Sequence, residues 1–478
     1  MDGTPLRTPL PIDVVPSSAA ESGEGTRRPS SPPTTAERTA GRPPAYVLLF
    51  LGGLVLSMFS GNSKLLGLPV APDRVVFALS LVLLARTGQL AAVVRGRGGL
   101  AGLMAATTAW VVGSALAAGT LFTNYGLFAL VDRILLPFVF FLLAGVLFRD
   151  VRSRNLLLRV LVLVGLYLGL TAFFEMIGPH ALVVPRYIMD PDAGILFGRA
   201  RGPFLASDAD GLVMVASLAA AVVGWSRWRG IWRWVAAATF LVCSLGALLT
   251  LTRSIWVGAA LGLTLTGLAA PRLRRWLPLV LVTLAAGVVV ALGTLPGLHE
   301  DAASRATTSR SLQDRENTNS AALRIVRERP LTGVGWMRFI DVSEDYVRQS
   351  DEFPLTNIHI EVHNVILGRA AELGLPGAAL WVLCLLAGPV AAAVRPLSGP
   401  PDIEEWRLIL LAALTCWVVA IMVSPVPYAL PNYLVWLLGG FVAAHGRRRR
   451  PAEQPSEASD DVPFLPAPSP VARHIAEG

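Results

Sequence analysis

The residues with the clearest potential for chemistry lie where a long polar stretch meets an apolar run. His363-Asn364 closes the polar stretch 297–362 in a chain that is otherwise almost continuously hydrophobic. A neutral imidazole can take a proton from a hydroxyl group near neutral pH. The position therefore predicts a reactive side chain at a membrane surface.

His363 has three interpretations from spacing alone. It can act as a general base toward an acceptor hydroxyl. It can join His359 and Glu361 as a metal ligand, because alternate residues share one face of a strand. It can also be structural and cap the helix that follows. No partner carboxylate stands at a characteristic metal-ligand spacing, so we favour a site without metal.

A second group of candidates consists of arginines in the connections between apolar runs. Arg199 and Arg201 lie in the stretch 177–208, Arg253 lies in a tight turn, and Arg315 lies in the long polar loop. A planar guanidinium matches phosphate oxygens with two parallel hydrogen bonds. Together these arginines predict a site for a lipid-linked diphosphate. The alternative is that each one contacts ordinary lipid phosphates at the membrane interface.

The composition indicates a membrane protein. Of the 478 residues, 53% are hydrophobic and 15% are charged, whereas a soluble chain would carry about 25% charged residues. The net charge of +8 could suit nucleic acid, but the arginines cluster in short loops between apolar runs. That pattern is typical of membrane orientation, so we expect no nucleic-acid partner. All three cysteines lie in apolar runs, which indicates neither a disulfide framework nor a cysteine zinc site.

The apolar runs predict an all-α, polytopic membrane domain over residues 45–446. Each run approaches the roughly 20 residues that cross a bilayer, which gives about twelve transmembrane helices. The predicted spans are residues 45–60, 73–94, 99–122, 127–148, 156–176, 209–226, 233–251, 254–270, 276–296, 376–394, 404–424 and 428–446. The polar ends, residues 1–44 and 447–478, cannot bury a core, so we expect disordered tails, the second after a basic start.

The long loop 297–362 should be partly helical. Asn317-Thr-Asn-Ser320 can cap a helix that Pro330 ends, and Leu331-Thr-Gly-Val-Gly335 predicts a tight glycine turn. A second short helix should begin near His363-Asn364 and break at Gly374, before the next span.

Basic residues alternate along the connections as the positive-inside rule requires. With the N-terminus in the cytoplasm, every second connection is rich in arginine, and Arg447 to Arg450 follow the last span. Both tails are therefore expected in the cytoplasm. The stretch 177–208, the turn at Arg253 and the loop 297–362 are expected on the outer face of the cytoplasmic membrane.

Four short motifs follow one another along the chain. They are Arg199-Ala-Arg-Gly202-Pro-Phe204, Thr252-Arg253-Ser-Ile-Trp256, Arg315 followed by Pro330-Leu-Thr-Gly-Val-Gly335, and His363-Asn364-Val-Ile-Leu367 followed by Glu372-Leu-Gly374. In this order the chain resembles the O-antigen ligase and polysaccharide polymerase superfamily of bacterial membrane glycosyltransferases, over roughly residues 45–446. Two departures are Ala206-Ser-Asp208, where that family commonly has Asn-Pro-Asn, and Asn319, where an aromatic is common.

The resemblance implies a reaction. Such enzymes take a glycan from a polyprenyl-diphosphate carrier outside the cytoplasmic membrane, where the glycosyl–diphosphate bond and not ATP supplies the driving force. The implied partners are this donor, a glycan, lipid or cell-wall acceptor, and membrane lipids. No metal or other cofactor is implied, and attack opposite the leaving group would invert the anomeric centre.

The resemblance also implies roles for the candidate residues. His363 would orient or deprotonate the attacking hydroxyl, and Asn364 would position backbone or sugar. Arginines would clamp the diphosphate and stabilise charge on the leaving group, with Arg253 counted among the catalytic residues. The arginines at the matching positions are Arg199, Arg201, Arg253 and Arg315.

A transporter or flippase for a polysaccharide or another anionic solute would have the same hydropathy. Asp132-Arg133, inside the fourth predicted span, supports this alternative, because charges within a membrane often mark a pathway. The two could instead neutralise each other near the interface. We favour the enzyme over a transporter or an inactive scaffold, because the notable charges gather on one face. The motifs do not separate a ligase from a polymerase.

The orientation can be tested by labelling single cysteines in a variant that lacks Cys243, Cys384 and Cys416. A cysteine in place of Ser311 should react with a membrane-impermeant maleimide in intact cells. A cysteine in place of Arg229, in an arginine-rich connection, should react only after lysis. The reverse pattern would overturn the orientation and move the candidate site to the cytoplasmic face.

Overall fold

The computed structural model describes residues 43–68, 70–93, 98–270, 274, 310–348, 360–395, 397–398 and 400–448. These residues are mostly helical. The exceptions are loops and two short antiparallel strands, β1 (Leu397–Ser398) and β2 (Arg447–Arg448). The helical fold class is thus confirmed for this part of the chain, and most of both predicted tails lies outside it.

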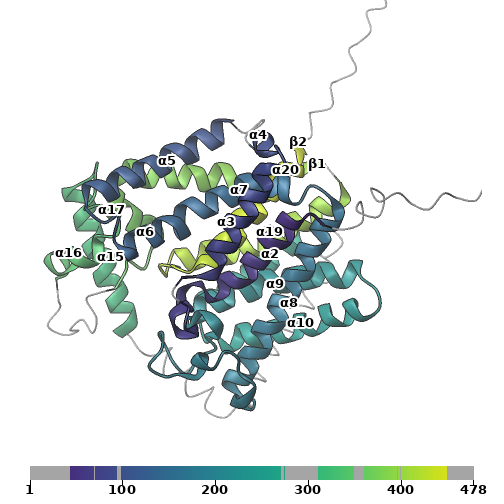
Figure 1. The fold of residues 1–478 in the computed structure, drawn as a ribbon. Coiled ribbons are helices and arrows are strands. Elements are labelled where there is room, and N and C mark those ends of the chain that lie inside the picture. The colour runs from purple at the N-terminus through teal and green to yellow at the C-terminus, as the bar shows by residue number, and fades with distance from the viewer. Residues whose placement is uncertain are drawn as a thin grey trace, which may run out of the picture. The chain divides into compact units, whose positions relative to one another are not determined.

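The helices of the described residues lie between Ala45 and His445 (Figure 1). The first part comprises α2 (Ala45–Leu56), η1 (Ser57–Leu66), α3 (Pro72–Arg86), α4 (Leu90–Val93), α5 (Gly98–Ala117), α6 (Asn124–Leu130), η2 (Val131–Leu135), α7 (Leu136–Leu147), α8 (Val151–Met176), η3 (His180–Leu182), η4 (Arg186–Met189) and η5 (Gly202–Phe204). The second part comprises α9 (Ser207–Arg227), α10 (Ile231–Leu249), α11 (Arg253–Ala269), α15 (Arg310–Glu328), α16 (Phe339–Tyr346), α17 (Val365–Leu385), η6 (Leu386–Val390), α18 (Ala391–Val394), α19 (Pro401–Ile421) and α20 (Ala429–His445).

Seven helical stretches among the described residues are long and apolar enough to cross a membrane. They are Ala45–Leu66, Gly98–Ala117, Asn124–Leu147, Val151–Met176, Ser207–Arg227, Ile231–Leu249 and Val365–Val394. The predicted spans 73–94, 254–270, 404–424 and 428–446 largely coincide with α3, α11, α19 and α20, and the span 276–296 lies outside the described residues. A membrane protein is therefore supported, while the total of about twelve spans stays a prediction.

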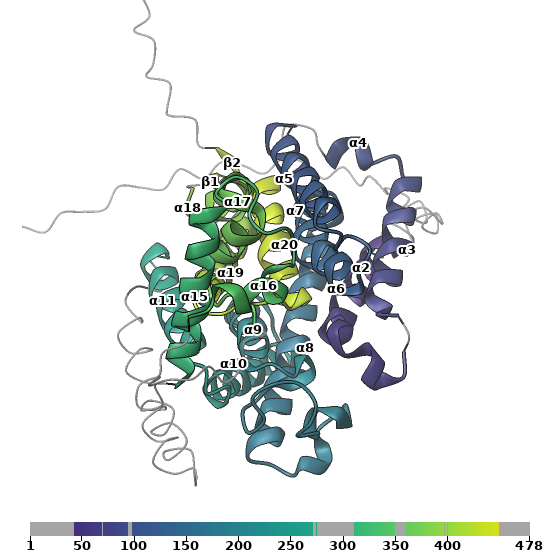
Figure 2. The ribbon, with the colours of Figure 1, turned by 90° about the vertical axis from the view of Figure 1, so that its left-hand side faces the viewer.

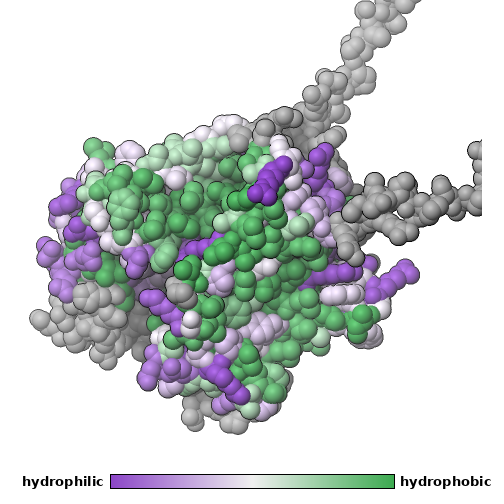
Figure 3. All heavy atoms as spheres, viewed as in Figure 1, coloured by the Kyte–Doolittle hydropathy of each residue, from purple (hydrophilic) through white to green (hydrophobic). Residues whose placement is uncertain are grey.

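The surface agrees with a lipid environment. Val75 on α3, Trp234 on α10 and Val257 on α11 are each more than half exposed. Figure 3 shows apolar side chains over much of one face, with hydrophilic ones gathered toward its edges. Exposed apolar surface of this extent is rare on soluble monomers and typical of contact with a membrane.

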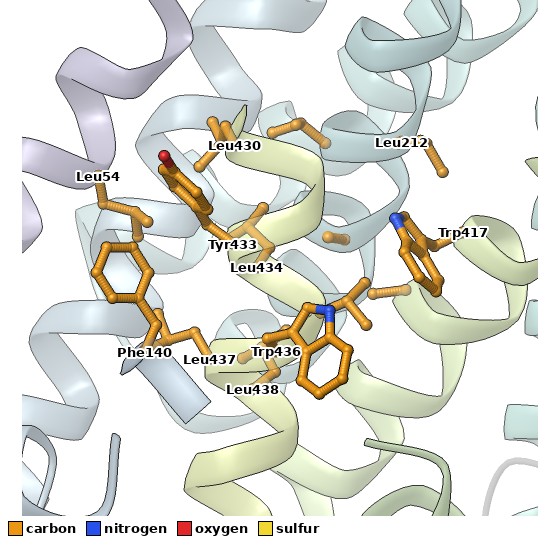
Figure 4. Close-up of a cluster of buried hydrophobic side chains, with 14 of the residues drawn as sticks. Leu54, Phe140, Leu212, Trp417, Leu430, Tyr433, Leu434, Trp436, Leu437 and Leu438 are labelled. Atoms are coloured by element: carbon orange, nitrogen blue, oxygen red, sulfur yellow. The ribbon is translucent and has the colours of Figure 1, made fainter. Parts of the chain in front are cut away.

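Helix α20 lies at the centre of the packing. Its residues 429–442 are all buried, and it contacts α7, α19 and α9. Figure 4 shows Tyr433 and Trp436 on this helix among leucines, with the ring of Tyr433 4.9 Å from that of Phe140. A Cβ at Gly440 would lie 1.9 Å from the carbonyl oxygen of Phe141, so only glycine permits α20 to approach α7 this closely.

Two sets of contacts define opposite ends of the helices. At one end, the Thr252 hydroxyl donates to Ser207 Oγ, which joins the starts of α11 and α9. At the other end, Arg154 near the start of α8 pairs with Asp402 on α19 at 2.6 Å. Arg227 also donates to the Asp402 carbonyl, at 3.2 Å, so the arginine-rich connections around Arg154 and Arg227 lie at the end away from the turn at Arg253. Which side of a membrane each end faces stays a prediction.

The charges at Asp132 and Arg133 do not neutralise each other. They lie in the π-helical turn η2, and each pairs with a different element. Asp132 accepts from Arg74 at 2.7 Å and from the Tyr433 hydroxyl at 2.8 Å. Arg133 pairs with Glu361 instead. Both charges therefore have partners, which weakens the observation that supported a transport pathway.

The segment around His363 folds largely as expected. Asn364 caps α17 by accepting from the Leu367 N–H at 3.0 Å, and Gly374 breaks the helix with φ 71°. The glycine turn 331–335 is also present, with φ 63° at Gly333 and 106° at Gly335. The predicted cap of the preceding helix is wrong, because α15 begins at Arg310 and continues through residues 317–320.

The glycine turn packs directly on the break in α17. The N–H groups of Val334 and Gly335 donate to the carbonyls of Ala371 and Glu372, and the Leu375 N–H donates to Pro330. A Cβ at Gly374 would lie 2.3 Å from the Leu331 carbonyl oxygen. Figure 2 shows α15 beside α17 with α16 close to both, so these contacts join the loop helices to α17.

Candidate functional site

Hydrogen bonds to α8 hold the loop that carries Arg199. Glu175, near the end of that helix, accepts from the backbone N–H groups of Arg201 and Gly202 at 3.0 and 3.1 Å. The Arg201 side chain is fully buried and donates to the carbonyls of Ala193 and Ile188 at 2.6 and 2.9 Å. Its guanidinium fixes the loop and offers no exposed surface to a ligand, which argues against the diphosphate-binding role expected for it.

Arg199, by contrast, is only half-buried. It lies close enough to Asp208 for the two charges to interact. Asp208 stands in the first turn of α9, where it accepts from the Ser424 hydroxyl at 2.7 Å. Ser424 follows α19, so this carboxylate joins the arginine loop to the connection between α19 and α20.

Arg253 and Arg315 approach the same place from two further elements. Arg253 is exposed at the start of α11, and Arg315 is half-buried on α15. Burial and repulsion from the Arg253 guanidinium lower the pKa of Arg315, and the Asp208 carboxylate offsets part of this effect. Asp208 thus interacts with Arg199 and Arg315, while Arg253 interacts with Arg315 and follows Thr252, whose hydroxyl donates to Ser207 beside Asp208. We call Asp208 and these three arginines the arginine cluster.

His363 is half-buried in the bend before α17. The capping hydrogen bond of Asn364 fixes the start of that helix, and thus the direction in which the preceding residue leaves it. Asn364 therefore has a structural task in addition to the positioning role expected for it.

Glu361, two residues before His363, is tied to the membrane helices. Both of its oxygens accept from Arg133, at 2.7 and 2.8 Å, and the Tyr125 hydroxyl donates to it at 2.5 Å. Burial alone would raise the pKa of the Glu361 carboxyl, but the Arg133 charge and these hydrogen bonds hold it below its usual value. The segment that carries His363 is thereby attached to α6 and η2.

These contacts bear on the metal interpretation of residues 359–363. Because both Glu361 oxygens are engaged by Arg133, this carboxylate is poorly placed to ligate a cation as well. His359 lies outside the described residues. Within the described part of the chain, no group of three or more metal-ligating side chains comes together.

Tyr428 connects the two halves of the site. It precedes α20 and lies within electrostatic range of both Asp208 and Glu361. In the same connection Ser424 donates to Asp208, and Pro425 lines a pocket with Glu361 and Val362. This connection therefore links the arginine cluster to the segment that carries His363, although more than a hundred residues separate Arg253 from His363 in the chain. The sequence interpretation missed Asp208, Tyr428 and the partners of Glu361. Asp208 had appeared only as a departure from a motif.

Comparison with known families places this arrangement in context. Residues 238–382, less than a third of the chain, match the family model described as O-antigen ligase. This stretch contains Arg253, Arg315 and His363, while Arg199 lies before it. The resemblance to the O-antigen ligase and polymerase family is thus confirmed over these residues. No curated protein matches the chain.

The contrast between two neighbouring arginines is testable. Arg201→Lys removes a buried fork of donors, so we expect the apparent melting temperature of the purified protein to fall, by an equivalent of roughly 1–3 kcal/mol. Arg199→Lys should leave that temperature unchanged and lower activity. A stable but inactive Arg201→Lys protein would return Arg201 to the ligand-binding residues.

Proposed function

We propose, from the similarity to the O-antigen ligase family, that this chain is a glycosyltransferase of the bacterial cytoplasmic membrane. It moves a glycan from a polyprenyl-diphosphate carrier to an acceptor hydroxyl on the outer face. The observation that supports the proposal is the connection between α19 and α20, which contacts Asp208 of the arginine cluster through Ser424 and lines a pocket beside the His363 segment through Pro425. The arginines supply cationic groups for a diphosphate, and His363 supplies a base for the acceptor hydroxyl.

The arginine cluster suits the donor diphosphate. The guanidinium groups of Arg253 and Arg315 repel each other, and Asp208, which also interacts with Arg199, balances only part of this charge. A diphosphate would relieve that repulsion and accept paired hydrogen bonds from the planar forks. As the glycosyl bond breaks, the same groups stabilise the charge that develops on the leaving diphosphate. No metal ion is needed for that neutralisation.

His363 acts on the acceptor. The acceptor oxygen forms a new bond to the anomeric carbon, and the bond from that carbon to the diphosphate oxygen breaks. The electron pair of the broken bond leaves with the diphosphate, and the acceptor proton passes to the imidazole of His363. Attack from the face opposite the leaving group inverts the anomeric centre. The Arg133–Glu361 pair attaches the chain two residues before His363 to η2.

Deleting the gene in its native host tests this function. Lipid-linked glycan should accumulate, as long chains if a ligase is lost and as single repeat units if a polymerase is lost. Arg253→Lys keeps the charge but loses the fork, so it should restore transfer roughly 100-fold less well than the unchanged protein. Arg229→Lys is the matched control, because Arg229 is exposed at the opposite end.

Two results would contradict the proposal in different ways. A deletion strain without accumulated lipid-linked glycan would remove the glycosyltransferase assignment itself. Equal effects of Arg253→Lys and Arg229→Lys would mean that Arg253 contributes only to insertion or folding.

The role of His363 separates a base from a metal ligand. His363→Ala should lower transfer about 100-fold or more, while lipid-linked glycan still co-purifies with the protein. Activity should persist in EDTA, and His359→Ala should have a mild effect. Chelator-sensitive activity that a divalent ion restores, together with a large loss in His359→Ala, would favour the metal site. Glu361→Ala cannot decide this, since it also removes the partner of Arg133.

A further inference from the structure

A pocket opens beside the first half of α17, next to the arginine cluster and distinct from it. Four charged side chains line it, Arg133, Glu361, Arg369 and Glu372. Phe339 on α16 and Pro425 in the connection between α19 and α20 form apolar walls. From the sequence alone, Glu361 is a candidate metal ligand, Arg133 is part of a candidate transport pathway and Glu372 is a motif residue, whereas no role is predicted for Arg369, Phe339 or Pro425.

Arg369 is the most unusual member of this lining. It is only 6% exposed, and its Nε donates no hydrogen bond to any described residue. The guanidinium lies 4.5 Å above the ring of Trp336, and its contact with Glu372, at 3.7 Å, is too long for a hydrogen bond. A buried donor left in this state is costly, and a ligand with acceptor oxygens would satisfy it.

The charges of the lining balance. Two arginines face two carboxylates, so the pocket does not select an anion as the arginine cluster does. A hydroxyl group both donates and accepts hydrogen bonds, so it can bind guanidinium and carboxylate together. Apolar walls beside convergent polar groups suit the ring of a sugar, which carries hydroxyls at its edge and C–H groups on its faces. A neutral sugar fits this combination better than a second diphosphate.

The position of the pocket indicates whether its sugar belongs to the donor or to the acceptor. Glu361 and Val362 line it just before His363, and Val365 and Gly368 line it just after. Pro425 follows Ser424, whose hydroxyl donates to Asp208 in the arginine cluster. An occupant of the pocket would therefore contact the residues on both sides of His363 and lie next to the connection that binds the arginine cluster.

We propose that this pocket binds the terminal sugar of the acceptor and presents its hydroxyl to His363. The assignment rests on the proposed glycosyltransferase function and adds the acceptor subsite to it. Arg369 and Glu372 bind sugar hydroxyls, while Phe339 and Pro425 contact the ring.

Gly368 allows the pocket to be filled without disturbing the backbone. A Cβ at this position meets Val362 at 3.4 Å, an ordinary contact, and the chain beyond it would enter the pocket. Gly368→Leu should lower transfer about tenfold or more, and Gly368→Ala should lower it less. Gly113→Leu is the matched control, because Gly113 is exposed on α5 with no atom within 4 Å of its added Cβ.

The deletion strain supplies both substrates for the assay, its accumulated lipid-linked glycan and its unmodified acceptor. In Gly368→Ala and Arg369→Lys, added acceptor extract should restore the rate, whereas His363→Ala should stay slow at any acceptor level. All three proteins should retain as much co-purified lipid-linked glycan as the unchanged protein. Gly368→Ala and Arg369→Lys decide the test if Gly368→Leu does not reach the membrane.

The outcomes separate this inference from the function on which it rests. Wild-type rates for Gly368→Leu and Arg369→Lys, with Arg253→Lys still inactive, would refute the acceptor pocket and leave the glycosyltransferase intact. Loss of co-purified donor in the pocket variants would also refute it, since the pocket would then hold the donor. A deletion strain without accumulated glycan would remove both.

Discussion

The paired hydrogen bonds between Arg133 and Glu361 decide how the loop meets the membrane domain. Arg133 belongs to a helix with the composition of a membrane span, and Glu361 stands two residues before His363. Leaving either charge without its partner would cost roughly 3–5 kcal/mol, because neither is fully exposed to water. The start of α17, and with it the place of His363, depends on this ion pair. Its geometry is bidentate, so it fixes an orientation as well as a distance.

A second constraint acts through backbone alone. The glycine turn donates backbone hydrogen bonds to α17 just before Gly374, and α17 donates one back to Pro330. The two segments approach so closely that a Cβ at Gly333 or Gly374 would overlap the other segment's backbone. Each segment needs its glycine because the backbone of the other segment lies so close. This mutual fit gives a physical reason why a glycine turn before α16 and a glycine within α17 occur in the same chain. Because this turn follows α15, the contact also fixes α15, which carries Arg315, against α17, which begins after His363.

The sequence predicted those structural features that depend only on residues close together in the chain. Asn364 caps α17 and Gly374 ends its first half because a side-chain acceptor and a residue tolerant of positive φ suffice for these features. The start of α15 was missed, since the polar residues 317–320 are held in a helix that packs against α17. Arg201 and Arg199 differ by two positions and look equivalent in the sequence. Only the packing of the loop on Glu175 turns one inward and leaves the other partly exposed.

The arginine cluster and the Arg133–Glu361 pair respond differently to the surrounding electrolyte. Mobile ions screen charges over about 8 Å at physiological ionic strength, and they act on Arg253 because it is exposed. The enclosed ion pair is largely out of their reach. In the proposed function the arginine cluster faces the outside of the cytoplasmic membrane, where the salt concentration varies with the habitat. Rising salinity would then weaken the attraction of the proposed anionic lipid donor while the framework around His363 stays intact, so the proposed transfer would slow as the salt content rises.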